Sequence, residues 1–71
     1  MSDTTGTKNI IEGLLEEIAR NRELLKVYEE IPVGQFGAHF IRQGIARAEQ
    51  AMITGDTIKM IVEYQNLKEN K

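Results

Sequence analysis

Apolar residues recur every three or four positions over residues 8–30, which is the spacing of one face of an α-helix. The members of this pattern are Ile11, Leu14, Leu15, Ile18, Leu25 and Tyr28. In the second half of the stretch the apolar face moves round the helix by roughly 100°, far more than the ~20° per heptad of helical drift. The shift falls across a polar run, residues 20–23. We therefore expect one long helix whose two halves pack against different partners.

A second pattern of helical period covers residues 36–54, and small residues form a strip along it. These small residues are Gly37, Gly44, Ala48, Ala51 and Gly55. A glycine in mid-helix costs roughly 0.5–1 kcal/mol relative to alanine. A close helix crossing would offset that cost. Gly44 and Ala48 are therefore expected where the backbone of another helix comes near.

The third stretch of helical period, residues 57–67, is apolar around more than half of its circumference. Its apolar members are Ile58, Met60, Ile61, Val62, Tyr64 and Leu67. A surface helix needs an apolar stripe only a little over ~100° wide. This helix is therefore expected to be buried on two sides.

Two breaks separate the three stretches. Pro32, the single proline of the chain, lacks a backbone N–H and disfavours helix at the residue before it. Gly55 followed by Asp56 is typical of a helix stop and a new helix start. The sequence thus predicts an all-α fold: one long N-terminal helix and then a helix-turn-helix hairpin, packed as a small helical bundle.

The same patterns divide the chain into three parts. Residues 1–7 are small and polar and predict a disordered tail, residues 8–67 form a single helical domain, and residues 68–71 are expected to fray. Short connections make neighbouring helices antiparallel, so the second helix covers the later part of the first. The N-terminal half of the first helix is then left uncovered.

Covering that half requires either a second chain or the third helix. We expect a homodimer, because a chain of this length has little stability to spare. The predicted interface residues are Ile11, Leu14, Leu15, Ile18, Gly44 and Ala48. The alternative is that the third helix folds back over the N-terminal half within one chain.

The composition restricts the possible sites. The chain has 71 residues, a net charge of −2 and no cysteine, so a disulfide or a thiolate zinc site is excluded. The first residues lack the pattern of a signal peptide, and the apolar runs are too short to span a membrane. We therefore expect a cytoplasmic protein with no membrane partner.

No motif of catalysis is present in the sequence. His39 is the only histidine and has no acidic residue or second histidine at helical spacing, so we interpret it as a surface residue. The glutamates of the first helix lack the Glu-x-x-His pairs of metal sites in helical bundles. The sequence thus predicts no catalytic residue, no cofactor and no metal site.

The aromatic residues are few, and the core is the default location for each of them. They are Tyr28, Phe36, Phe40 and Tyr64. Phe36 and Phe40 lie close together on the second helix. Either of them, if exposed, would mark a contact site.

One polar face is a candidate for binding. His39, Arg42, Gln43 and Arg47 give the outer side of the second helix a slightly basic, amide-rich character. Arginine and glutamine read base edges from helices in the major groove. The negative net charge and the scarcity of lysines for phosphate contacts argue against nucleic acid.

The stretch Ala48-x-x-Ala51-x-x-x-Gly55-Asp56 resembles the hairpins of helical-repeat proteins, although no second copy follows at their period of ~34 residues. The function that the sequence favours is a non-enzymatic helical interaction or accessory module. It would associate with itself or bind an unidentified protein. A small DNA-binding transcriptional regulator using the outer face of the second helix is the alternative, and an enzyme is least favoured.

Overall fold

A computed structural model describes residues 5–71 of the chain, with side chains from Ile10 onward. Within that range three helices pack against one another and no strand forms. They are α1 (Thr5–Glu29), α2 (Gln35–Thr54) and α3 (Thr57–Lys68), with a 3-10 turn, η1 (Pro32–Gly34), between the first two. The predicted all-α bundle of three helices is confirmed. The first helix begins at Thr5 and not near residue 8, and the rest of the predicted tail lies outside the described residues.

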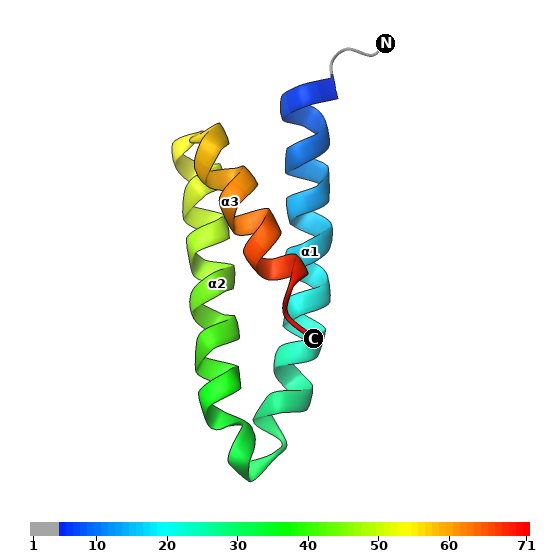
Figure 1. The fold of residues 1–71 in the computed structure, drawn as a ribbon, viewed down its shortest axis with the longest axis vertical. Coiled ribbons are helices and arrows are strands. Elements are labelled where there is room, and N and C mark those ends of the chain that lie inside the picture. Colours follow the sequence, from blue (N-terminus) through cyan, green and yellow to red (C-terminus); the bar gives the residue numbers. More distant parts are fainter. Residues whose placement is uncertain (1–4) are drawn as a thin grey trace.

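The long helices α1 and α2 form an antiparallel hairpin, and α3 lies against the upper part of both (Figure 1). The hairpin follows from the short connection through η1, which returns the chain alongside itself. The molecule measures 46 × 21 × 16 Å and is elongated along these two helices. Because α3 has 12 residues and α2 has 20, α3 covers only part of the hairpin.

Both predicted helix breaks are present. Ile31 is extended (φ −103°, ψ 121°), as the ring of the following Pro32 requires. Gly55 adopts the left-handed conformation (φ 72°). The N–H of Asp56 donates at 3.1 Å to the carbonyl of Ala51 in the last turn of α2. These two features end the helix in a Schellman motif. The Asp56 carboxylate then accepts at 3.1 Å from the N–H of Lys59 and caps the start of α3.

The hydrophobic core lies where the three helices meet. Its buried members are Leu14, Ile18, Ile41, Ile45, Ala48, Ala51, Met60 and Leu67. The third helix thus folds back over the N-terminal half of α1 within one chain, which is the alternative to a dimer at this position. Leu14 and Ile18 are buried and cannot contact a second chain while α3 is in place. The prediction that they lie at the centre of a dimer interface is therefore corrected: they belong to the core of a single chain. Ile11 is partly buried, and Leu15 is exposed.

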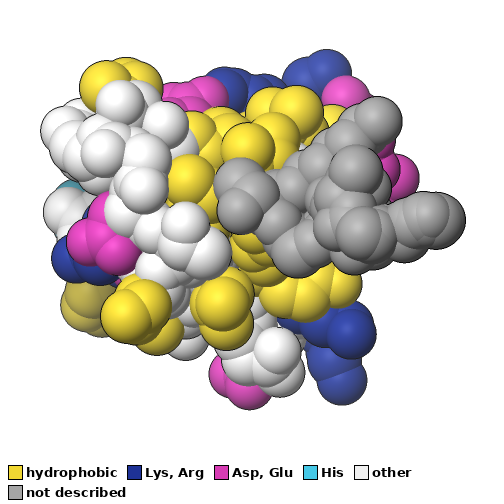
Figure 2. All heavy atoms as spheres, turned by 90° about the horizontal axis from the view of Figure 1, so that it is seen from above, with side chains coloured by type: hydrophobic (Ala, Val, Ile, Leu, Met, Phe, Trp, Pro, Cys, Tyr) yellow, Lys and Arg dark blue, Asp and Glu magenta, His cyan; other side chains and the backbone are white. Residues whose placement is uncertain are grey.

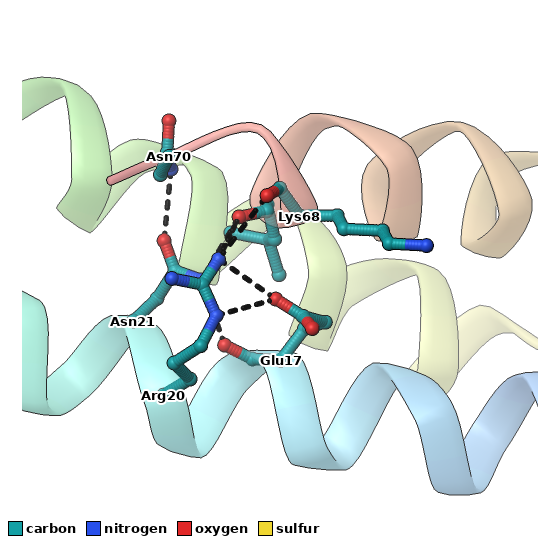
Figure 3. Close-up of polar contacts among 6 residues, drawn as sticks. Glu17, Arg20, Asn21, Lys68 and Asn70 are labelled. Atoms are coloured by element: carbon teal, nitrogen blue, oxygen red, sulfur yellow. Dashed lines mark hydrogen bonds and ion pairs between the residues drawn. The ribbon is translucent and has the colours of Figure 1, made fainter.

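The polar run of α1 lies beside the C-terminal end of α3, whose last carbonyls need partners from outside the helix (Figure 3). Arg20 Nη2 donates to the carbonyl oxygen of Leu67 at 2.7 Å, and Asn21 Nδ2 donates to the same oxygen at 3.1 Å. Asn21 is fully buried, and its Oδ1 accepts from Asn70 Nδ2 at 2.8 Å. We call Arg20, Asn21 and Asn70 the C-terminal clasp of α3.

The contacts with α1 continue beyond the end of α3, as far as Lys71. Tyr28 Oη donates to the carbonyl oxygen of Lys71 at 2.6 Å. The fraying expected of residues 68–71 is opposed by this bond and by the clasp. The polar run therefore interrupts the apolar face of α1 at the level where α3 ends and its carbonyls need donors.

Candidate interaction surface

The strip of small residues on α2 accommodates side chains from the other two helices. A Cβ atom added at Gly44 would lie 3.2 Å from Leu67 Cδ2, and one added at Gly37 would lie 2.5 Å from the ring of Tyr28. Ala48 is fully buried. The strip thus supports close packing, but the expectation of a neighbouring backbone at Gly44 is wrong, because the atom that comes near is the tip of a leucine side chain.

The polar face predicted on α2 is divided by the structure. His39, Arg42 and Gln43 line one groove of about 440 Å³ between α1 and α2. The other residues that line it are Arg22, Leu25, Ile45, Ala46 and Glu49. Arg47 lies elsewhere, and its Nε donates to both carboxylate oxygens of the buried Glu63 at 3.2 Å.

The charges around this groove are neutralised locally. Arg22 forms an ion pair with Glu49, and Arg42 forms one with Glu29 at 3.1 Å. An arginine that binds a phosphate has to give up such a partner, which reduces the gain from the contact. Hydrophobic atoms contribute most of the exposed lining of the groove. The groove therefore offers little for nucleic acid.

The most exposed apolar side chains on the α3 side of the hairpin lie beyond the end of α3. On α2, Gly44 and Arg47 contact α3. Phe40 lies one helical turn before Gly44 and Phe36 lies two turns before it, so both are on the side of α2 that faces α3. Phe36 is 90% exposed and Phe40 is 62% exposed. This corrects the prediction that both phenylalanines are core residues.

The corresponding side of α1 is also apolar beyond the clasp. Val27 lies seven residues after Arg20, so it shares the side of α1 that faces α3, and it is exposed. Leu24 and Tyr28 are partly buried at the same level. We call these five side chains the uncovered surface: Leu24, Val27, Tyr28, Phe36 and Phe40.

The outer side of α3 carries a second set of exposed apolar residues. Ile58, Ile61 and Val62 are 75%, 53% and 49% exposed, and their spacing of three and four places them on one face. Viewed from above, hydrophobic side chains gather at several places on the surface of this end of the molecule (Figure 2). The excess of apolar residues on this helix is evident from the sequence, but the spacing does not show which side faces the hairpin.

Other kinds of site find little support among the described residues. No group of three histidine, aspartate or glutamate side chains in this part of the chain is placed to hold a metal ion. None of the helices within residues 5–71 is both long and apolar enough to cross a membrane. Comparison of the chain with known protein families, with curated proteins and with solved structures finds no match.

Proposed function

We propose that this chain is a non-enzymatic interaction module that binds protein through the apolar side chains on the α3 side of the bundle. The observation that carries the proposal is the exposure of Phe36 and Phe40, side by side on α2. Burying a side chain of this size contributes about 1.5–3 kcal/mol relative to leaving it exposed. Aromatic residues, phenylalanine among them, are also enriched at protein interfaces relative to the rest of the surface.

The rest of the fold supports this location for an interface. The side chain of Tyr28 lies against Gly37 and is tied to the carbonyl of Lys71. The two phenylalanines therefore project beside a surface that is already ordered. An ordered surface loses less side-chain entropy when a partner binds.

The DNA-binding alternative has less support. It needs arginines of α2 to be free for bases or phosphates, whereas Arg42 pairs with Glu29 and Arg47 pairs with Glu63. The net charge of −2 also lacks the basic balance that steers a protein to nucleic acid. A protein partner requires neither of these features.

Site-specific photo-crosslinking tests the proposal. A photoreactive amino acid replaces Phe36 in one variant and Ala46 in a matched control, and both are irradiated in cells. Ala46 is exposed on the same helix but lines the groove with Arg42. We expect protein adducts from position 36 and few from position 46. Position 36 giving no adduct, or no more than position 46, would contradict the proposal.

A further inference from the structure

We propose that the partner is a second copy of this chain. Two copies would pack face to face and run in opposite directions, so that α3 of each lies on the uncovered surface of the other. The inference rests on the proposed function and adds the identity of the partner to it. It assigns an interface to both apolar surfaces that the single chain leaves exposed.

Because α3 is shorter than α2, the α3 side of the molecule has a raised upper part and a lower part. At ~1.5 Å per residue, α3 is about 18 Å long and α2 about 30 Å, so α3 forms a raised layer over the upper part of the hairpin and about 12 Å of α2 lies beyond it (Figure 1). A two-fold rotation that reverses the long axis places the raised part of one copy opposite the lower part of the other. The interface is then isologous and closes at two chains, which is the commonest symmetry of soluble oligomers.

The side chains that would meet are apolar on both sides. The outer face of α3 presents Ile58, Ile61 and Val62, followed on the same face by the uncharged Gln65. The uncovered surface opposite it presents the aliphatic Val27 and two phenylalanines. The side chains of the outer face and of the uncovered surface carry no charge. The charged Lys71 lies next to Tyr28 and would have to stay at the solvent-exposed rim of the interface, because burying an unpaired charge is costly.

The two-sided character of α3 also finds an explanation. Its inner residues Met60, Glu63 and Leu67 are buried against the hairpin of the same chain. Its outer residues have no function in the core of that chain. In the dimer α3 would lie between two hairpins, and a helix in that position needs the broad apolar surface that the sequence shows.

The second half of α1 fits the same arrangement. Its apolar face is rotated relative to the first half, and Leu24 and Tyr28 follow Asn21, which contacts the end of α3, by about one and two helical turns. Within one chain that rotation leaves apolar side chains partly exposed. A helix from a second copy would cover them.

The available area is that of an ordinary protein interface. A rectangle of 46 by 21 Å encloses the face seen in Figure 1, and it is somewhat larger than the roughly 800 Å² that each partner buries in a standard interface. A dimer that used most of this face would therefore reach the usual size. A contact between the α3 helices alone would not.

Mass measurement in solution is the first test. At ~100 μM, where a dimer of micromolar Kd forms, sedimentation equilibrium should give twice the chain mass of 8.1 kDa. Phe40→Ser and Ile61→Ser should each shift the mass toward that of the monomer while circular dichroism shows an unchanged helix content. Ile53→Ser is the matched control, because Ile53 is also exposed but belongs to neither surface.

Several results would overturn the inference. A monomeric wild-type chain at this concentration is one, and a dimer that resists both substitutions is another. If the chain is monomeric while position 36 still gives adducts with a different protein, the second copy is rejected as partner and the proposed function stands. If position 36 gives no adduct in cells and the mass is that of the monomer, both are rejected.

Crosslinking between engineered cysteines tests the arrangement itself, since the chain has no cysteine of its own. An equal mixture of the Phe40→Cys and Ile61→Cys variants, treated with a short bis-maleimide, should give much more mixed dimer than the twofold excess over each homodimer that random pairing produces. Each Ile61 is expected opposite a Phe40 of the other copy. A mixed dimer at or below that twofold excess, or an excess of the Ile61→Cys homodimer, would reject the face-to-face arrangement.

Discussion

Replacing Asn21 with alanine removes the centre of the C-terminal clasp. Asn21 is fully buried, and its side chain makes three hydrogen bonds: to the carbonyl of Glu17 in its own helix at 2.8 Å, to that of Leu67 at 3.1 Å, and from Asn70 at 2.8 Å. The last two connect α1 to the end of α3. Because the chain between these residues spans more than 45 positions, these bonds contribute to tertiary stability.

The expected cost follows from these contacts. A hydrogen bond within a protein contributes about 1 kcal/mol net, so losing the two bonds to the end of α3 destabilises the fold by about 2 kcal/mol. The Leu67 carbonyl keeps its bond from Arg20, which prevents a larger loss. The higher helix propensity of alanine offsets up to ~0.7 kcal/mol of this loss of stability. The void left by the shorter side chain adds to the loss.

Urea unfolding followed by circular dichroism measures this change, and Arg22→Ala is the matched control. Arg22 is the next residue of α1 but forms an exposed ion pair with Glu49, which contributes at most ~1 kcal/mol. For a chain of this size 2 kcal/mol lowers the melting temperature by about 8–16 °C. If Asn21→Ala costs less than ~0.5 kcal/mol, or if a double-mutant cycle with Asn70→Ala shows no coupling, the clasp does not hold α3.

Three further predictions concern stability and are checked by thermal unfolding. Gly44→Leu should cost about 1–3 kcal/mol because the new side chain overpacks against Leu67, and an unchanged melting temperature would reject that packing. Arg47→Ala should cost about 1–3 kcal/mol by leaving the buried carboxylate of Glu63 short of its main donor, whereas Arg47→Lys should restore part of the loss. Gly55→Ala should cost about 1 kcal/mol from the positive φ alone, since nothing lies within 4 Å of an added Cβ; a stabilised variant would contradict this.

The helices and their breaks could be predicted from the sequence because local chemistry determines them. Pro32 cannot continue α1, and Gly55 is suited to the left-handed end of α2, whatever lies around them. The small-residue strip likewise predicts close packing. It does not predict which group packs there, and at Gly44 the neighbour is a side chain from α3.

The sequence allows α3 to fold back over α1, but the level at which α3 ends on the hairpin could not be predicted, because the residues that hold that end are polar. Asn21 lies in a run that the pattern places at the surface, and it is buried only because the end of α3 requires a donor there. The ion pair of Arg47 with Glu63 similarly connects two helices across the bundle. The exposure of Phe36 and Phe40 depends on where α3 ends, which apolar spacing alone does not show.

The Schellman turn at Gly55 also determines which chain completes the core. Without this turn, α2 and α3 would continue as one helix from residue 35 to residue 68, about 51 Å long. The α3 segment would then point away from its own hairpin, and its inner face could cover Leu14 and Ile18 only in a neighbouring chain. Such an exchange of identical elements is domain swapping, so the backbone angle of one glycine separates a self-contained fold from an intertwined one.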